Sequence, residues 1–332
     1  MARIVLAQGT SHSPQLSIDP EQWDVFRERD RDANLLQDST GRRYSFDELI
    51  EIRGSELETA IGMDEWRRQK QACDVAIDDL RAAMAAADPD IVIVIGDDQQ
   101  ELFDTDNLPA LAIYRGPTIL TSGVGSRDKI QRVEGNPVRA MSEWAYSPSE
   151  DVQWPVSVEM ADHLLAGLTQ GGFDLTQSDR HPRPRGIGHA WGFPFQRVFD
   201  RPRPTVPLMI NTYYPPNQPT PRRCLELGEA LRSTIESFPA DVTVGVMASG
   251  GLSHHLIDEA LDRTVLEALS SANLDPLGAI PGVALEGGTS EIRNWIVMGP
   301  CASALSQTML VYEPCYRSLA GTGCAMAFGS WS

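Results

Sequence analysis

Short, continuously apolar segments that alternate with amphipathic segments are the feature that most constrains the fold of this chain. Each apolar segment is bounded by Gly, Pro or Asp. Strands that are apolar on both faces are typical of a sheet covered on both sides, as in α/β proteins. The predicted strands are Arg3–Ala7, Ile91–Ile95, Leu111–Tyr114, Val206–Ile210 and Val242–Ala248.

Three segments between or after these strands carry apolar residues at helical spacing. From Trp66 to Ala87 they recur every three or four positions, and Asp88-Pro89 ends the pattern. Thr220-Pro221 predicts the start of a second helix, and Ile257–Leu269 forms a third. We therefore expect an α/β fold, a single domain with a central, mostly parallel mixed sheet flanked by helices on both faces.

The domain is expected to span residues 1–332, because no repeat, low-complexity tract or linker divides the chain. Two segments interrupt the alternation: a helical excursion at about 18–57 and a loop-rich excursion at about 121–155. Long excursions of this kind often cover functional sites. The N-terminal segment predicts a first strand rather than a signal peptide, so we expect a cytoplasmic protein.

The charge balance excludes some classes of partner. The chain has 46 acidic and 28 basic residues, a formal net charge of −18, whereas nucleic acids and anionic membranes need clustered Lys and Arg. A local basic patch, Arg180, Arg183 and Arg185, could still hold an anionic small molecule. The five cysteines form no CxxC pair and predict neither a disulfide framework nor a zinc site.

Polar residues cluster where the predicted strands end, the place where open α/β sheets bind ligands. No phosphate-binding loop, HExxH motif or dinucleotide fingerprint is found in the sequence. Asp97, Asp98, Gln99 and Glu101 follow one strand. Residue spacing alone leaves structural histidines and helix-capping acids open as alternatives and names no reaction. Four of the six histidines lie in these loops or in a glycine-flanked one: His12, His189, His254 and His255.

Four motifs occur in order along the chain: Thr10–Pro14, Gly188–Phe193, Ser249–His254 and Glu291–Trp295. Three further motifs are Tyr44–Leu49, Asn211–Gln218 and Ile257–Arg263. The first four resemble the class III extradiol ring-cleavage dioxygenases, the protocatechuate 4,5-dioxygenase catalytic-subunit superfamily. The other three resemble its 3-O-methylgallate dioxygenase branch, which is the branch most similar to this chain.

The resemblance implies a non-heme Fe(II) held by two histidines and one carboxylate. His12 matches the first ligand. Gln99 stands where the family has a histidine after an aspartate, so we expect a Gln99 carbonyl ligand, with Asp98 or Glu101 as substitutes.

The third implied ligand is a glutamate in a helix after the Gly-Gly-x-Ser-His loop. An ungapped match falls on Ala260, which cannot coordinate a metal, so we predict Glu259. His189 is the implied acid/base residue, and His254 would hydrogen-bond the substrate or oxygen.

The implied reaction inserts both atoms of O2 beside the diol of a catecholic aromatic acid of the protocatechuate, gallate or 3-O-methylgallate type. One of the three arginines of the basic patch could pair with the substrate carboxylate. We expect a homodimer, because symmetric dimers are the commonest assemblies.

Two other functions stay open at this point. Because Gln99 replaces a histidine, the protein could be a metal-dependent, non-oxidative enzyme acting on an aromatic or cyclic substrate. It could also be a non-catalytic relative that binds an aromatic ligand. Oxygen consumption distinguishes ring cleavage from both.

Overall fold

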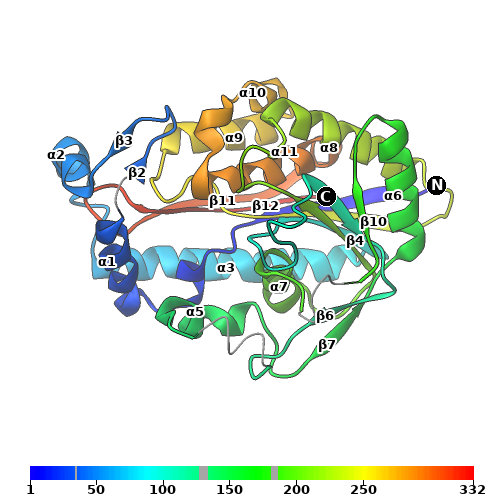
Figure 1. Ribbon diagram of the computed structural model, residues 1–332, viewed down its shortest axis with the longest axis horizontal. Coiled ribbons are helices and arrows are strands. Elements are labelled where there is room, and N and C mark those ends of the chain that lie inside the picture. The colour runs from blue at the N-terminus through cyan, green and yellow to red at the C-terminus, as the bar shows by residue number, and fades with distance from the viewer. Residues whose placement is uncertain (34–35, 127–133, 181–185) are drawn as a thin grey trace.

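A computed structural model describes residues 1–33, 36–126, 134–180 and 186–332. A mixed sheet lies at its centre (Figure 1). The sheet has eight strands in the order β11-β12-β1-β10-β4-β9-β5-β8. Four neighbouring pairs, β1·β10, β10·β4, β4·β9 and β5·β8, are parallel, and β1·β12, β11·β12 and β5·β9 are antiparallel. The strands are β1 (Arg3–Thr10), β4 (Ile91–Asp97), β5 (Leu111–Tyr114), β8 (Thr176–Ser178), β9 (Thr205–Ile210), β10 (Thr243–Ser249), β11 (Gln307–Tyr316) and β12 (Gly323–Trp331).

The central strands are apolar on both faces because both faces are covered. In β4, Ile91, Ile93 and Ile95 join one hydrophobic cluster, and the alternate residues Val92 and Val94 join another. Successive side chains of a strand point to opposite faces, and both faces of β4 pack against a core, so neither set of side chains has to be polar. The sheet is therefore the middle layer between two cores.

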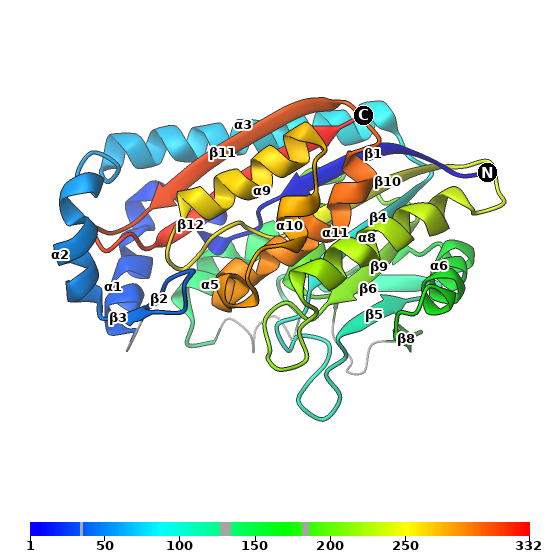
Figure 2. The same cartoon turned by 90° about the horizontal axis from the view of Figure 1, so that it is seen from above.

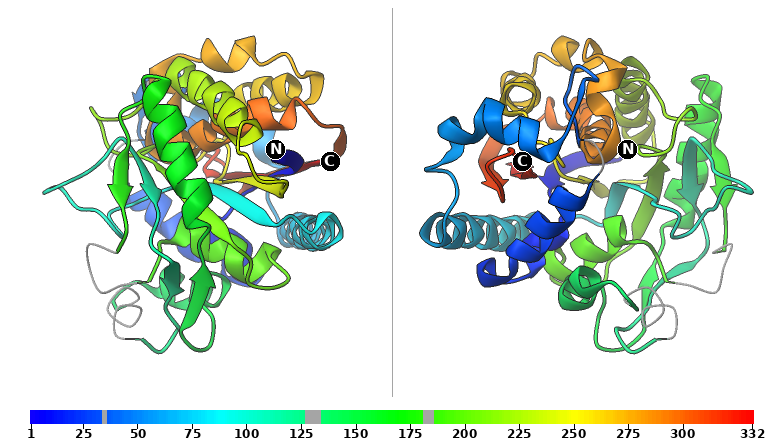
Figure 3. Two further views of the ribbon diagram at one scale, coloured as in Figure 1. Left: turned by 90° about the vertical axis from the view of Figure 1, so that its right-hand side faces the viewer. Right: turned by 60° about the vertical axis from the view of Figure 1, so that its left-hand side comes forward.

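Helices form the two outer layers (Figures 1 and 3). One face is covered by α6, α8, α9, α10 and α11, and the other by α3 and α7; from above, α8, α9 and α11 lie across the strands (Figure 2). The helices are α1 (Asp24–Asp32), α2 (Phe46–Leu57), α3 (Met63–Ala87), α5 (Pro137–Ser142), α6 (Val158–Gln170), α7 (His189–Phe193), α8 (Pro221–Glu236), α9 (Glu259–Ser271), α10 (Asp275–Gly278) and α11 (Ile292–Ala302).

Shorter elements connect these layers. Two small ribbons lie outside the main sheet. In the described ranges, no helix combines the length and the apolar character that a membrane span requires. The ribbons pair β2 (Leu36–Gln37) with β3 (Arg43–Tyr44) and β6 (Thr118–Thr121) with β7 (Val152–Pro155). The short helical turns are η1 (Pro14–Ser17), η2 (Pro20–Gln22), η3 (Glu143–Ala145), η4 (Pro194–Val198), η5 (Gly282–Leu285) and η6 (Gly287–Glu291).

The predicted fold class is confirmed, and so are the five predicted strands and three predicted helices, with ends shifted by a few residues. Within the predicted helical excursion at about 18–57, α2 begins at Phe46 and ends at Leu57. Ser45 caps it, because its hydroxyl accepts from the Glu48 amide while the Glu48 carboxylate accepts from the Ser45 amide. The strands β11 and β12 were not predicted.

A buried ion pair attaches the first excursion to the sheet. The Asp30 carboxylate of α1 accepts from Arg317 Nε at 2.8 Å and from Nη2 at 3.0 Å. Gln15 Oε1 accepts from Nη1 of the same guanidinium at 3.0 Å. Breaking a buried pair leaves an uncompensated charge and costs about 3–5 kcal/mol, so this contact holds α1 beside the end of β11.

Candidate metal centre and active site

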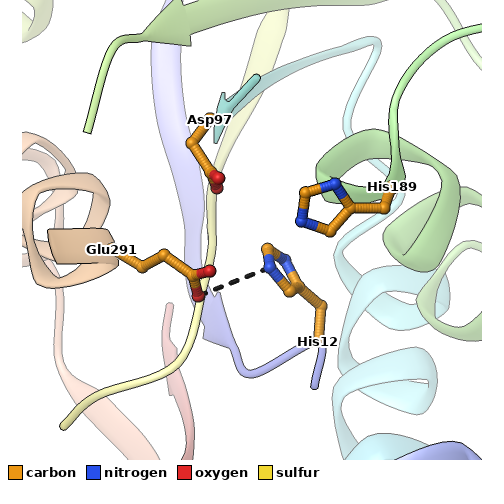
Figure 4. Close-up of side chains that lie close together, drawn as sticks. All are labelled: His12, Asp97, His189 and Glu291. Atoms are coloured by element: carbon orange, nitrogen blue, oxygen red, sulfur yellow. Dashed lines mark ion pairs between the residues drawn. The ribbon is translucent and has the colours of Figure 1, made fainter. Parts of the chain in front are cut away.

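The carboxyl ends of β1 and β4, which lie on either side of β10, bring chemistry-bearing residues together with side chains from two helical segments. His12 lies just beyond β1, and Asp97 is the last residue of β4. His189 begins α7, and Glu291 ends the η6 turn that leads into α11. One potential ligand atom from each of these four residues lies within 4.8 Å of the others (Figure 4). Residues from four distant parts of the chain therefore form one cluster.

His12 presents one nitrogen to this cluster. Its Nδ1 lies 2.9 Å from Ser249 Oγ, the last residue of β10, and the Tyr146 hydroxyl donates to its backbone oxygen at 2.5 Å. Its Nε2 is buried, lies 3.4 Å from Glu291 Oε2 and has no hydrogen-bond partner among the described residues. A buried imidazole nitrogen without a partner is free to bind a cation.

The orientation of His189 depends on Glu101. Glu101 Oε2 lies 2.6 Å from His189 Nδ1 and accepts from the His189 amide at 2.7 Å. Gly188 permits this approach, because a Cβ there would lie 2.3 Å from the same carboxylate oxygen. Burial by itself lowers the pKa of His189, but the Glu101 carboxylate outweighs it and raises the pKa to about 9. With Nδ1 occupied, Nε2 is the nitrogen that faces the cluster (Figure 4).

Glycines allow Glu291 to approach the sheet. A Cβ on Gly9 would lie within 2.7 Å of the Trp295 ring, and a Cβ on Gly250 would lie 2.9 Å from Glu291 Cβ. Glu291 Oε2 accepts from the Gly251 amide at 2.6 Å, which fixes the carboxylate. Burial raises the pKa of Glu291, but the nearby His12 and His254 hold it well below the usual range.

The end of β4 supplies the other carboxylate. Asp97 is fully buried, and burial together with the charge of Glu291 raises its pKa. Gln99 Nε2 donates to Asp97 Oδ2 at 3.3 Å and to Glu291 Oε1 at 3.5 Å.

The side chain of Asp98 binds the backbone of the loop that follows β4 and not the cluster. Its carboxylate accepts from three backbone amides, those of Glu101, Leu102 and Phe103, at 2.9–3.0 Å. Burial raises the pKa of Asp98 to about 6.

The cluster has the chemistry of a metal site. Two buried carboxylates lie beside two imidazoles, and within the described ranges the ion pairs of Glu291 involve only histidines. Paired negative charges away from water are unfavourable unless a cation compensates them. Imidazole nitrogens with carboxylate oxygens suit a divalent first-row metal, so these residues fit the metal that the sequence resemblance implies.

The structure does not bring the predicted ligand Glu259 to this cluster. Glu259 is the first residue of α9, where its Oε1 accepts from the Tyr316 hydroxyl at 2.9 Å and its Oε2 pairs with Arg263 at 3.1 Å. It lines a separate cavity of about 730 Å³ beneath α2. Glu291 occupies the position expected of Glu259, and it belongs to a segment that already resembled the family's late helix.

The other predicted residues divide between the site and its surroundings. His254 Nδ1 lies 2.8 Å from Leu252 O, so its Nε2 faces the site, 3.7 Å from Glu291 Oε1. Burial lowers the pKa of His254, but Cys324 and Glu291 raise it well above the usual value. Arg180 is exposed and does not line the cavity beside the cluster. Arg183 and Arg185 lie outside the described residues.

A cavity of about 300 Å³ adjoins the cluster. That volume suits one small aromatic molecule. Its wall contains His12, His189, His254 and Glu291, and also three arginines that the sequence analysis did not single out: Arg29, Arg139 and Arg317.

Comparisons with known proteins identify the family of the chain. Residues 59–315, more than half of the chain, match the family described as the catalytic LigB subunit of aromatic ring-opening dioxygenase. The chain is 33% identical over 166 residues to a gallate dioxygenase of Pseudomonas putida, covering 44% of this chain and 45% of that protein. It is 26% identical over 185 residues to a 2,3-dihydroxyphenylpropionate/2,3-dihydroxicinnamic acid 1,2-dioxygenase of Comamonas testosteroni, covering 55% of this chain and 49% of that protein.

These matches span about half the length of the two curated relatives. The family match begins after His12 and includes Asp97, His189 and Glu291. The chain therefore belongs to the family of the catalytic LigB subunit of aromatic ring-opening dioxygenases.

Proposed function

We propose that the protein is an extradiol dioxygenase that opens the ring of a catecholic aromatic acid of the protocatechuate, gallate or 3-O-methylgallate type. The observation that carries this proposal is the buried cluster of His12, Asp97, His189 and Glu291 beside a cavity in a chain of this family. The homodimer and the cytoplasmic location remain predictions.

His12 and Glu291 would hold the metal, together with a residue at the end of β4. The resemblance implies Fe(II). Bound there, such an ion would supply Lewis-acid and template chemistry to a catechol and dioxygen. The gallate dioxygenase and dihydroxyphenylpropionate dioxygenase that the chain resembles carry names of the same reaction class.

His189 would move the proton of the substrate. Because Nδ1 is bonded to Glu101, Nε2 is the nitrogen that would accept a phenolic proton as the catechol binds and return it later. The negative charges of Glu101, Asp97 and Glu291 favour the imidazolium in the metal-free protein. A cation bound by this cluster would offset those negative charges, and the lower local negative charge would favour the neutral form of His189.

His254 and the arginines would orient the ring. With Nδ1 bonded to Leu252 O, Nε2 of His254 can hydrogen-bond a substrate oxygen. Arg317 is held by Asp30 and Gln15 and lines the same cavity, as do Arg29 and Arg139. A guanidinium pairs with a carboxylate in a defined geometry, so this wall would receive the acid group of the substrate.

Metal content and oxygen uptake of anaerobically purified protein test the proposal. We expect about one metal ion per chain and substrate-dependent oxygen uptake with protocatechuate, gallate or 3-O-methylgallate. His189→Ala should keep the metal and lose most turnover, because it removes the base and no ligand. Glu291→Gln should lose metal, whereas the matched control Glu259→Gln should keep it.

Absence of oxygen uptake after metal is restored would contradict ring cleavage and favour a non-oxidative enzyme or an aromatic-binding protein. Full activity of His189→Ala would remove His189 from the mechanism.

A further inference from the structure

Three polar side chains at the end of β4 could complete the metal site: Asp97, Asp98 and Gln99. Asp98 is excluded by its contacts, because its two oxygens already accept from the three backbone amides of the following turn. Moving it to a metal would leave those buried amides without an acceptor. The choice therefore lies between Asp97 and Gln99.

The amide of Gln99 is oriented away from metal binding. Its Nε2 faces Asp97 Oδ2 at 3.3 Å and Glu291 Oε1 at 3.5 Å. An NH2 group donates hydrogen bonds and has no lone pair for a metal, and its placement next to two carboxylates is the electrostatically favoured one. Gln99 is thus suited to orient the carboxylates rather than to coordinate.

Asp97 has the position, burial and charge of a ligand. A carboxylate oxygen of Asp97 is within 4.8 Å of the potential ligand atoms of His12 and Glu291, and the residue is fully buried. Its hydrogen bonds to Gln99 and to Asn294 Nδ2 are long, 3.3 and 3.5 Å, which leaves the carboxylate poorly compensated. His12 Nε2, which has no hydrogen-bond partner in the described part of the chain, lies 3.4 Å from Glu291 Oε2 in the same cluster.

We propose that Asp97, and not Gln99, is the third metal ligand, so that one imidazole and two carboxylates hold the ion. This inference rests on the proposed function for the presence of a metal but not for its reaction. Carboxylate-rich sites suit harder ions such as Mn(II), whereas imidazole favours iron. The centre therefore discriminates less strongly between Fe(II) and Mn(II) than a site with two imidazole ligands, and it accepts Mn(II).

Mn(II) binding by the full chain tests the ligand. Titration of metal-free protein with manganese chloride, followed by electron paramagnetic resonance of the free ion, should give one site per chain for the wild type. Gln99→Ala removes only the amide that orients the two carboxylates, so it should keep one site per chain with a weaker affinity. Asp97→Ala should lose stoichiometric binding. The inference is overturned if Asp97→Ala binds Mn(II) like the wild type, or if Gln99→Ala is the variant that loses the site. Circular dichroism checks that each variant is folded.

The variant Gln99→His provides a second test that does not depend on the folding of Asp97→Ala. It offers an imidazole beside Asp97, so anaerobic dialysis against equal Fe(II) and Mn(II) should raise the bound Fe:Mn ratio by about threefold or more over wild type. An unchanged ratio would overturn the claim about ion preference.

Oxygen uptake separates this inference from the proposed function. Loss of Mn(II) binding in Asp97→Ala, in a wild type that never consumes oxygen with the three acids, supports the ligand and contradicts the reaction. Oxygen uptake by the wild type together with stoichiometric Mn(II) binding by Asp97→Ala supports the reaction and overturns the ligand.

Discussion

The Glu101 carboxylate determines which nitrogen of His189 faces the cavity, since one of its oxygens contacts both the His189 ring and the His189 amide. Glu101→Gln keeps the size of the side chain but removes the charge and one acceptor. We expect kcat to fall by about 10- to 100-fold, as for other residues that orient a functional histidine, with a smaller change in KM. Steady-state oxygen uptake measures both constants.

A matched control for this change is Glu58→Gln, because Glu58 is exposed at the end of α2. It should leave kcat unchanged. Glu101→Asp keeps the charge and should recover part of the lost kcat. Equal kcat for Glu101→Gln and wild type would show that His189 does not need this partner.

Sequence reasoning found some residues of the site and missed others for a physical reason. His12, His189 and His254 lie in short loops whose glycines and place beside strand ends are visible in the sequence. Glu291 comes to the cluster only because Gly9 and Gly250 let α11 approach the sheet, a contact between distant segments. A motif match along the sequence therefore selected Glu259, because Glu259 begins the helix that directly follows the Gly-Gly-x-Ser-His loop.

At the scale of elements, the predicted strands are central and buried, although the equally buried strand β12 was missed. The central strands are apolar on both faces and read as continuous runs. The missed strand β11 contains Pro314 and is exposed or half-buried over its first half, because it forms an edge of the sheet. Proline is tolerated at the edge of a sheet, because its missing amide breaks no hydrogen bond of the ladder there. In the sequence, however, a proline inside a segment argues against a strand, so β11 was not predicted.

Asp262 connects α9 with β11 and with the loop after β10, and it gives the fold a pH dependence. Its carboxylate accepts from the Ser253 amide at 2.9 Å, the Ser253 hydroxyl at 2.7 Å and the Tyr312 hydroxyl of β11 at 2.8 Å. Burial outweighs these donors and raises the pKa of Asp262 to about 6. A raised pKa means that the folded state binds this proton more tightly than the unfolded state, so the residue destabilises the fold as pH rises through that range.

Asp262→Asn should remove this contribution. Well below pH 4 the residue is protonated in both states, and well above pH 6 the wild type bears the whole cost, about 3 kcal/mol. The unfolding free energy of Asp262→Asn relative to wild type should therefore rise by about that amount from about pH 3 to pH 7 in urea titrations. The exposed control Asp64→Asn should show a flat difference, and a flat difference for Asp262→Asn would mean that hydrogen bonding offsets burial.

At the scale of the whole molecule, the cluster joins segments that are far apart in the chain. Its four members occur at positions 12, 97, 189 and 291, on β1, β4, α7 and η6 or just beyond them. Parallel strands place their carboxyl ends at one edge of the sheet, so the topology and not the local sequence brings these donors together. A bound ion would therefore cross-link segments from nearly the whole length of the chain.

Metal binding should consequently stabilise the entire protein. An ion that binds the folded state alone adds about 2.7 kcal/mol when its free concentration is 100 times its Kd. Urea unfolding with Mn(II) and after removal of metal by EDTA should differ by about this amount. Glu291→Ala removes a ligand, so its unfolding curve should not respond to Mn(II), whereas Glu259→Ala should respond like the wild type. An equal response of Glu291→Ala and wild type would show that the stabilising ion binds elsewhere.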